Sequence, residues 1–333
     1  MKLICFSFSE RGSRLGESLT DLRDHEIVHY RNRSIEGGVK SILKEAWGNY
    51  QGIIFISATG IATRLIAPYI EHKTKDPAVV VIDDLGRFVI SLLSGHLGGA
   101  NDIAEYIASK IDALPIITTA SDSRGFQAID IFAKDKGYHM ENLKSITELT
   151  AMMVDDKKIG FYTEDTKIID YPRLKVLDDL KDIEDIDGII MVSSERLRVD
   201  IPHTNLIPKN INIGIGCRKG IEGKRIIAAI EDVLSSLNIS NKGIKTIGTV
   251  EVKRGEQGII DTARYYNCPL KIFSIEEIKE VENRFEKSQF VKDTIGAYSV
   301  AEPCAYLLGG KFLSMKTKHN GITISITKEV GNG

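Results

Sequence analysis

Residues 52–64 read GIIFISATGIATR, and residues 78–102 read AVVVIDDLGRFVISLLSGHLGGAND. In both segments a run of Ile, Val and Phe leads into turns rich in Gly, Ser and Thr, and these turns open helical patterns. Turns of this kind leave backbone N–H groups unpaired at helix starts, which favours anionic ligands. Strands that alternate with helices in this way predict a mostly parallel, layered α/β sheet.

The same alternation extends over the first third of the chain. Strands are predicted at Leu3–Phe8, Glu26–Tyr30, Gly52–Ser57, Ala78–Ile82, Phe88–Ser91 and Pro115–Thr118. Helices are predicted near Gly37–Trp47, Ile61–Ile70 and Ala100–Ile111. In the last of these, Ile103, Ile107 and Ile111 recur every four residues on one face. We therefore expect an N-terminal α/β domain over residues 1–122.

Residues 123–208 differ in composition, because charge density rises and the apolar runs shorten. They predict a small α/β middle domain with strands at Lys158–Tyr162, Ile168–Tyr171 and Gly188–Val192. Ser145–Glu148 fits a capping box, which predicts a helix start there. Ser121–Gly125 and Pro202–Pro208 look like linkers and bound this domain.

Residues 209–333 resume the α/β alternation and predict a C-terminal domain. Its strands are expected at Asn212–Cys217, Lys245–Val252, Leu270–Ser274, Phe312–Lys316 and Ile322–Thr327. Its helices are expected around Ile226–Leu234 and over Glu256–Tyr266, Glu276–Phe285 and Val300–Leu308. A chain of 333 residues exceeds the usual size of one hydrophobic core, which agrees with a multi-domain α/β protein.

The composition excludes several classes of protein. A net charge of −2 and a pI near 6.4 argue against a nucleic-acid binder. No apolar run reaches the roughly 18 residues that a membrane span needs, and the first residues look like a strand rather than a secretory signal. The cysteines lack C-x-x-C spacing and the histidines lack metal-ligand spacing. We therefore expect a cytoplasmic protein with reduced thiols and no protein-held metal.

Specific segments carry a resemblance to a known family. In the first third they are ATGIA (58–62), DPAVVV (76–81), GRFVISLLSGHLGGAN (86–101) and PIITTASD (115–122). In the last third they are GIGCRKG (214–220), Lys253 with Glu256, Gly296 with SVAE (299–302), and Lys311. Together they resemble the cobalamin-biosynthesis family CbiG, whose last domain is shared with the stand-alone CobE proteins. The resemblance covers nearly the whole chain, in the family's domain order.

The resemblance implies a cobalt-precorrin-5A hydrolase of the anaerobic route to the corrin ring. In the implied reaction, water opens a lactone on the ring-contracted macrocycle. A two-carbon fragment then leaves as acetaldehyde, giving cobalt-precorrin-5B. The cobalt belongs to this tetrapyrrole substrate, so no separate cofactor is implied. A homodimer and transient contacts with other enzymes of the pathway are the expected protein partners.

The implied substrate is a flat ring edged with carboxylates, which calls for cationic side chains, backbone N–H groups and an apolar face. The cationic candidates are Arg64, Lys73, Lys75, Arg87, Arg218, Lys219 and Lys253. The candidates in turns are Thr59, Gly60, Ser94, Gly95, Gly98 and Gly99. Both sets have an ordinary alternative, since loop cations are often only solvated and these turn residues are common caps.

Two side chains are the catalytic candidates, His96 and Asp84. An imidazole exchanges protons near neutral pH, so His96 is expected to transfer them, with support of the glycine-rich turn as the alternative. Asp84 or Asp83 follows a buried strand and is expected to orient His96 or to act as base. Adjacent Asp residues are also ordinary turn formers. Cys217 at a strand-to-helix turn is a minor alternative nucleophile.

Other functions stay open on the residues alone. A carrier that binds a cobalt-tetrapyrrole without converting it would use the same cationic and glycine-rich turns. A nucleotide-binding α/β protein would use the glycine turns too, but the chain has no Walker lysine motif and no G-x-G-x-x-G followed by an acidic residue. Ser299–Glu302 fits a capping box, which predicts a structural role for Glu302.

Overall fold

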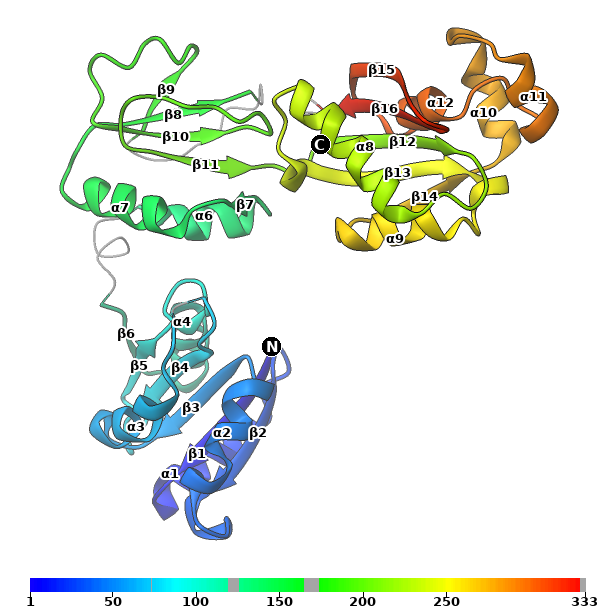
Figure 1. Cartoon of the computed structure of the whole chain (residues 1–333). Coiled ribbons are helices and arrows are strands. Elements are labelled where there is room, and N and C mark those ends of the chain that lie inside the picture. Colours follow the sequence, from blue (N-terminus) through cyan, green and yellow to red (C-terminus); the bar gives the residue numbers. More distant parts are fainter. Residues whose placement is uncertain (73, 119–125, 165–173, 330–333) are drawn as a thin grey trace. The chain divides into compact units, whose positions relative to one another are not determined.

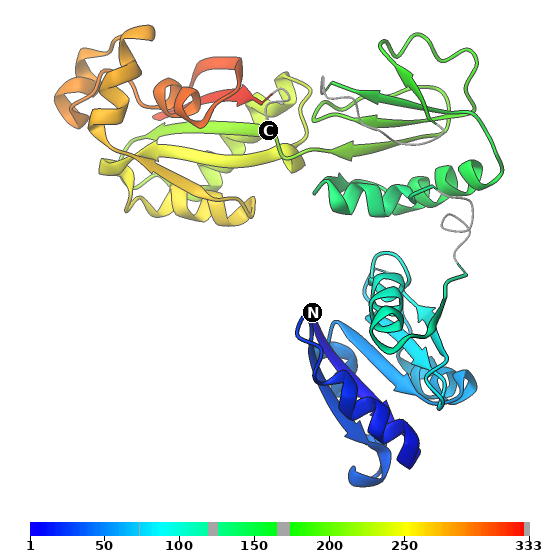
Figure 2. The same cartoon turned by 180° about the vertical axis from the view of Figure 1, so that it is seen from behind.

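The computed structural model of the chain describes residues 1–72, 74–118, 126–164 and 174–329 (Figures 1 and 2). The chain divides into two compact units, Met1–Ile131 and Phe132–Gly333. One sheet lies in the first unit and two lie in the second. Lys73, the predicted strand Ile168–Tyr171 and the predicted linker Ser121–Gly125 lie outside the described residues.

The first unit is built on a six-stranded sheet with the order β2-β1-β3-β4-β5-β6. Its strands are β1 (Lys2–Ser7), β2 (Glu26–Arg31), β3 (Gly52–Ile56), β4 (Ala78–Ile82), β5 (Phe88–Leu93) and β6 (Leu114–Ile116). Its helices are α1 (Glu10–Leu19), α2 (Val39–Asn49), α3 (Thr59–Ile66) and α4 (Ala100–Ile111), with 3₁₀ turns at Asn32–Ser34 and Ala67–Tyr69. Strands β1 to β4 are parallel, β5 is antiparallel to β4, and β6 is parallel to β5. The predicted mostly parallel α/β sheet is confirmed.

Helices cover both faces of this sheet, which explains the continuous apolar runs in its strands. Successive strand residues point to opposite faces. In β3, Ile54 packs into the core formed with α1 and α4, whereas Phe55 packs into the core formed with α2 and α3. Helix α1 lies where no helix is predicted. Its first turn is capped by Ser9, whose side chain accepts the Gly12 N–H at 2.9 Å.

The middle sheet has the order β7-β11-β10-β8-β9. Its strands are β7 (His139–Met140), β8 (Ile159–Thr163), β9 (Leu174–Leu177), β10 (Gly188–Val192) and β11 (His203–Ile207), and its helices are α6 (Ile129–Asp135) and α7 (Leu143–Val154). In both views α6 and α7 lie along one face of the sheet (Figures 1 and 2).

Two expectations for the middle segment are wrong. The predicted linker Pro202–Pro208 contains β11, because Thr204, Leu206 and Ile207 are buried beside β10. The predicted capping box at Ser145 is replaced by a cap at Asn142, whose side chain accepts the N–H groups of Lys144 and Ser145 at 2.9 and 3.3 Å. Helix α7 therefore starts earlier in the chain than the pattern indicates.

The C-terminal sheet has the order β14-β13-β12-β16-β15. Its strands are β12 (Ile211–Cys217), β13 (Ile244–Val250), β14 (Leu270–Phe273), β15 (Lys311–His319) and β16 (Ile322–Lys328). Its helices are α8 (Gly223–Ser236), α9 (Gln257–Tyr265), α10 (Ile275–Val281), α11 (Gln289–Ile295) and α12 (Ala301–Leu308), with 3₁₀ turns at Asn241–Gly243, Glu251–Lys253 and Glu282–Arg284. Strands β12, β13 and β14 are parallel, whereas β16 is antiparallel to β12 and β15 to β16. Helix α11 lies where none is predicted.

Each sheet falls within one of the three predicted ranges, residues 1–122, 123–208 and 209–333. The boundaries of these ranges as domains stay a prediction, since the compact units divide after Ile131. Among the helices formed by the described residues, none is both long enough and apolar enough to cross a membrane.

Lys328 joins the two sheets of the second unit. It lies at the end of β16, and its ammonium group forms ion pairs with Glu164 and Glu195 of the middle segment. Only 8% of the Lys328 side chain is exposed, against 21% for Glu164. Glu164 also accepts a hydrogen bond from Ser193. The junction therefore contains a mostly buried charge paired, among the described residues, with two carboxylates of the middle segment.

Replacing Lys328 by Met should destabilise the second unit. Removing one partner of a buried ion pair costs about 3–5 kcal/mol, and partial exposure of Glu164 reduces the expected loss to roughly 1–3 kcal/mol. Urea unfolding of Lys328→Met measures it. Lys245→Met is the control, because Lys245 pairs with Glu329 in a more exposed position and should cost less than about 1 kcal/mol. Equal losses in the two variants would contradict the prediction.

Candidate functional site

Strand direction separates the predicted site residues of the first unit into two groups. The carboxyl ends of the parallel strands β1, β3 and β4 lead into Ser9, Thr59–Arg64 and Asp83–Arg87, which we call the carboxyl edge. Because β5 runs back along β4, the loop Ser94–Gly99 lies at the opposite edge. A Cβ atom on Gly98 in that loop would lie 3.3 Å from the backbone nitrogen at the start of β4.

His96 and Asp84 are therefore not neighbours. The five residues of β4 separate their two edges, roughly 16 Å at about 3.3 Å per strand residue. The expectation that Asp84 orients His96 is wrong, because it assumed that successive turns lie on the same side of the sheet. The antiparallel β5 puts them on opposite sides.

At the carboxyl edge, helix α3 starts without a side-chain cap. Its N-cap is Ala58, and within the described part of the chain no acceptor bonds the N–H groups of Thr59 and Gly60, which are exposed. The guanidinium of Arg64 reaches back over this turn and donates to the Gly60 carbonyl at 3.2 Å. Open N–H groups beside a cation form the anion-binding arrangement predicted for Thr59, Gly60 and Arg64.

Asp84 lies at the same edge and binds the start of helix α1. Its carboxylate accepts a hydrogen bond from the hydroxyl of Ser9. A Cβ atom on Gly12 would lie 3.2 Å from the same carboxylate oxygen, so a glycine in α1 allows this approach. The Asp84 residue itself is exposed. Among the described residues Ser9 is its one hydrogen-bond donor, so the exposed carboxylate has oxygen lone pairs open to a bound molecule.

Asp83 has the turn-forming role. Its carboxylate accepts the backbone N–H groups of Arg87 and Phe88 at 2.6 and 2.9 Å and the Arg87 guanidinium at 3.0 Å. Burial alone would raise the pKa of Asp83, but these donors lower it below its usual value. The Arg87 side chain remains largely exposed, so it can still reach a ligand, although Asp83 already offsets part of its charge.

Apolar side chains complete the carboxyl edge. Ile61 in the first turn of α3 is 40% exposed, and Leu85 in the turn between β4 and β5 is 45% exposed. Single exposed apolar side chains are common on protein surfaces, but these two lie in the turns that also contain the open amides and Arg87, so they are accessible to a ligand bound there. This edge combines an apolar surface with the anion-binding groups that a carboxylate-edged ring needs.

The loop Ser94–Gly99 uses its own backbone N–H groups. The N–H groups of Gly99, Ala100 and Asn101 donate to carbonyls at positions 96, 94 and 95, at 3.0 to 3.1 Å. The N-cap of α4 is Gly99, and Asn101 and Asp102 both follow it in the first turn. The Asn101 side-chain oxygen accepts the Ser91 hydroxyl at 2.7 Å instead of capping the helix. The expectation that this turn leaves its backbone N–H groups unpaired is therefore wrong for Gly99, Ala100 and Asn101.

Ser94 holds a left-handed backbone, with φ at 55°. Its hydroxyl is buried, and within the described residues no partner bonds it. Gly95 and Gly98 are required by close packing, since Cβ atoms there would lie 2.7 Å from the Asn101 side chain and 2.4 Å from the Ser94 side chain. These glycines fold the loop tightly. The residues predicted here are together, but they form a compact turn rather than an open anion site.

In the second unit the carboxyl ends of β12 and β13 bring Arg218 and Lys253 to one edge of the C-terminal sheet. Lys253 pairs with Glu256 at 3.3 Å, and both side chains are mostly buried. Glu256 also accepts the Gly220 N–H at 2.9 Å. Burial would raise the pKa of Glu256, but this N–H and Lys253 lower it. Lys253 therefore holds the Gly220 turn through Glu256.

Cys217 stands beside this pair, at the end of β12. Burial raises the pKa of its thiol to about 11, although the nearby Lys253 opposes the shift. Below that pH the sulfur is protonated and a poor nucleophile. The minor alternative of a nucleophilic Cys217 is thus disfavoured.

Alkylation of Cys217 should be slow at neutral pH. At pH 8 the thiolate fraction is roughly a thousandth, and iodoacetamide labelling should accelerate about tenfold per pH unit up to pH 11. Mass spectrometry of the Cys217 peptide measures this rate. The same peptide labelled in urea is the control, and it should react quickly at pH 8. Rapid labelling of the folded protein at pH 8 would contradict the raised pKa.

The capping box predicted at Ser299 is not formed. Helix α12 has Val300 at its N-cap with no side-chain bond, and Ser299 instead donates to the buried carboxylate of Glu302 at 3.1 Å. Lys316 lies 3.8 Å from that carboxylate. The structural role expected for Glu302 is retained, with different partners.

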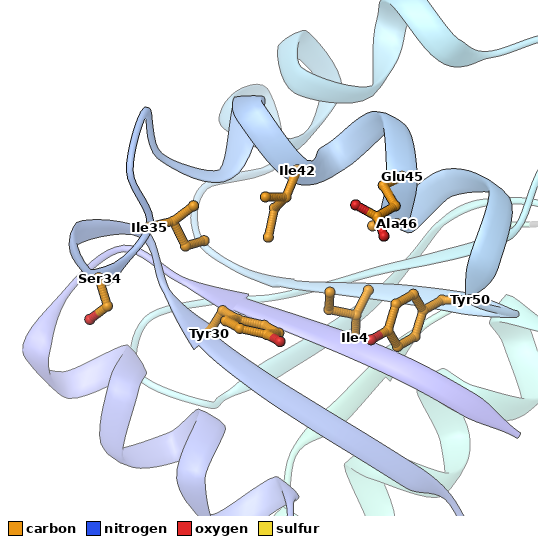
Figure 3. Close-up of a pocket in the computed structure, with 8 residues that line it drawn as sticks. All are labelled: Ile4, Tyr30, Ser34, Ile35, Ile42, Glu45, Ala46 and Tyr50. Carbon is orange, nitrogen blue, oxygen red and sulfur yellow. The ribbon is translucent and has the colours of Figure 1, made fainter.

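Neither of two open pockets contains the predicted site residues. One, of about 290 Å³, lies between α2 and strands β1 and β2. Figure 3 shows Ile42 projecting from α2 toward Tyr30 and Ile4 on those strands. The other, of about 670 Å³, lies between the starts of α8 and α9. Within the described part of the chain, no three His, Cys, Asp or Glu side chains come together as metal ligands.

Three family models match successive parts of the chain. They are described as Cobalamin synthesis G N-terminal over residues 41–122, Cobalamin biosynthesis central region over 127–208 and Cobalamin synthesis G C-terminus over 211–327. A curated protein of Salmonella typhimurium named cobalt-precorrin-5A hydrolase is 36% identical over 300 residues, covering 87% of this chain and 86% of its own. This chain belongs to the CbiG family. The predicted resemblance is confirmed.

Solved structures are also similar to this CbiG-family chain. A cobalamin biosynthesis protein G homolog from Sulfolobus solfataricus is 27% identical, covers 98% of this chain and 96% of its own, and has a TM-score of 0.42. CobE, a protein from the cobalamin biosynthetic pathway, is 24% identical, covers 38% of this chain and 95% of its own, and has a TM-score of 0.35.

The CbiG-family chain contains functional candidates that sequence reasoning missed. Ser9, Ile61 and Leu85 join Asp84, Thr59 and Arg64 at the carboxyl edge. Ser is a common N-cap residue, but the sequence after Ser9 has no Glu or Gln at the third position to mark a helix start there. Its pairing with Asp84, 75 residues away in the chain, was not detectable from local pattern.

Proposed function

We propose that this protein is a cobalt-precorrin-5A hydrolase, which opens the lactone of cobalt-precorrin-5A and releases acetaldehyde to give cobalt-precorrin-5B. The observation that carries the proposal is the 36% identity to a curated protein of that name over most of both chains. The carboxyl edge of the first sheet supports it, because it offers the groups that a carboxylate-edged macrocycle needs. The cobalt is part of the substrate, and no further cofactor is proposed.

The carboxyl edge is the proposed substrate surface. Arg64 binds a carboxylate of the ring edge. Ile61 and Leu85 contact its apolar face. Arg87 binds a second carboxylate where its guanidinium extends beyond Asp83. The remaining predicted binding residues, at the loop Ser94–Gly99 and at Arg218 and Lys253, stay proposals without an assigned contact.

Lactone opening requires a base for water and donors for the oxyanion. Asp84 is the proposed base, since its carboxylate is exposed and held at this edge. The open N–H groups of Thr59 and Gly60 are the proposed oxyanion donors. After the ring opens, the released hydroxyl gives its proton to a base and becomes the aldehyde carbonyl, the carbon–carbon bond breaks with its electron pair left on the conjugated macrocycle, and acetaldehyde leaves. His96 at the opposite edge lies too far away to share this task with Asp84.

A carrier of the same tetrapyrrole is the alternative, and one assay separates the two. Purified protein is incubated with cobalt-precorrin-5A, and acetaldehyde is followed by its reduction with alcohol dehydrogenase and NADH. One equivalent of acetaldehyde per macrocycle is expected, over many turnovers. A protein that binds the macrocycle and releases none is a carrier. A cytoplasmic location, a homodimer and contacts with other pathway enzymes stay predictions.

A further inference from the structure

Ser9 holds Asp84 in a way that fixes the direction of each hydrogen bond. The Ser9 hydroxyl accepts the Gly12 N–H at 2.9 Å, and a backbone N–H can only donate. An ionised carboxylate can only accept, so the single hydroxyl proton of Ser9 points to Asp84. Ser9 is therefore both the cap of α1 and the donor to the carboxylate.

A buried network fixes the Ser9 backbone from below. The Ser13 hydroxyl donates to the Ser9 carbonyl at 2.9 Å, and the Ser13 N–H donates to the same oxygen. We adopt the arrangement with the Ser13 proton placed there, in which the Ser7 hydroxyl donates to Ser13, at 2.9 Å. In that arrangement His29 Nε2, 2.8 Å from Ser7, donates to Ser7.

The charge state of His29 agrees with this direction. Burial lowers its pKa, and the nearby Glu17 partly opposes that shift, so the ring is mostly neutral near pH 7. A neutral ring has one N–H, and the adopted arrangement places it on Nε2. The chain of donors ends on a carbonyl, which has no proton to pass on. The network therefore positions Ser9 and does not conduct protons to Asp84.

The two glycines of α1 allow the side chains of Ser9, Asp84 and His29 to approach the helix closely. A Cβ atom on Gly16 would lie 2.4 Å from His29 Nε2, and one on Gly12 would lie 3.1 and 3.2 Å from the side-chain oxygens of Ser9 and Asp84. Glycine destabilises the interior of a helix, and α1 has two glycines within its 10 residues. The close approach of His29, Ser9 and Asp84 explains why both positions lack a side chain. Ser7 and Ser13 are both almost completely buried.

We infer that Ser9 is a positioning residue for Asp84, held by the network of His29, Ser7 and Ser13 so that its hydroxyl orients the Asp84 carboxylate for proton transfer at the carboxyl edge. This inference rests on the proposed function for the reaction in which Asp84 acts. The pairing of the two side chains does not depend on that reaction.

Steady-state release of acetaldehyde tests the inference in Ser9→Ala, Ser9→Thr and Asp84→Asn and in the double variant Ser9→Ala/Asp84→Asn. Ser9→Ala should lower kcat roughly 10- to 100-fold with KM nearly unchanged, because positioning of a base acts on the transition state. Thr keeps the hydroxyl and fits the extended Ser9 backbone, so Ser9→Thr should restore most of kcat. The double variant should be no slower than Asp84→Asn alone.

Ser18→Ala is the matched control. Ser18 lies on the same helix and is exposed, and within the described part of the chain its hydroxyl bonds no group but the Leu15 carbonyl, at 2.7 Å. Its removal should leave kcat at the wild-type value. A Ser9→Ala variant as active as Ser18→Ala would overturn the inference. So would equal losses in Ser9→Ala and Ser9→Thr, or losses that add to that of Asp84→Asn.

Unfolding equilibria keep the inference testable without turnover. If the wild-type protein releases no acetaldehyde, the proposed function fails, and the Ser9–Asp84 pair is judged by urea unfolding of Ser9→Ala, Asp84→Ala and their double variant, because Ala, unlike Asn, removes the acceptor of the Ser9 hydroxyl. Coupled side chains should change the unfolding equilibrium constant non-additively, by roughly threefold or more. Additive changes would overturn the pairing itself.

Discussion

Asp84→Asn should lower the rate of acetaldehyde release by roughly 10²- to 10⁴-fold, the usual contribution of a general base. Asn keeps an oxygen that accepts the Ser9 hydroxyl, so the start of α1 and the turn between β4 and β5 should stay folded. The loss should appear in kcat. The urea-unfolding midpoint should remain close to that of the wild type, which separates a chemical role from a structural one.

His96→Asn is the comparison that decides which edge of the first sheet carries the chemistry. The two residues lie at opposite ends of β4, and the loop around His96 uses its backbone N–H groups internally. His96→Asn should therefore keep near wild-type turnover. A large loss in His96→Asn with an active Asp84→Asn would move the catalytic site to the loop Ser94–Gly99 and contradict the assignment of Asp84.

Gly214→Ala should destabilise the second unit by about 3 kcal/mol or more, at or above the usual range for overpacking. Its Cβ atom would lie 1.9 Å from the Ala301 carbonyl oxygen and 2.6 Å from the Ala305 nitrogen. Both are backbone atoms of α12, so the helix as a whole would have to move away from β12. Urea unfolding, together with the yield of folded protein, measures the effect.

Gly255→Ala is the control for this substitution. Nothing lies within 4 Å of a Cβ atom at Gly255, and its backbone is not left-handed. Replacement there should be neutral or slightly stabilising, because alanine reduces the entropy of the unfolded chain. If Gly214→Ala unfolds at the same urea concentration as Gly255→Ala, then α12 does not pack against β12 as closely as described.

The local pattern of apolar and polar residues predicted where strands and helices lie better than it predicted where they end and what they contact. The runs of Ile and Val at β3, β4 and β10 are buried on both faces and were predictable as strands. Helix α1 was not predictable, because Gly12 and Gly16 weaken the helical pattern and are explained only by Asp84 and His29, which contact them from other elements. The cap of α7 moved from Ser145 to Asn142 for the same kind of reason: several residues can cap a helix, and packing selects one.

By itself the sequence determined the α/β class, most strands and the membership of the CbiG family, because apolar periodicity and the motif segments are properties of the chain in one dimension. Only the tertiary structure decided which candidates meet. Strand direction is set by pairing with neighbours, so the reversal at β5 carried His96 away from Asp84. The close approach of α1 to the end of β4 brought Ser9 to Asp84, through contacts between residues far apart in the chain.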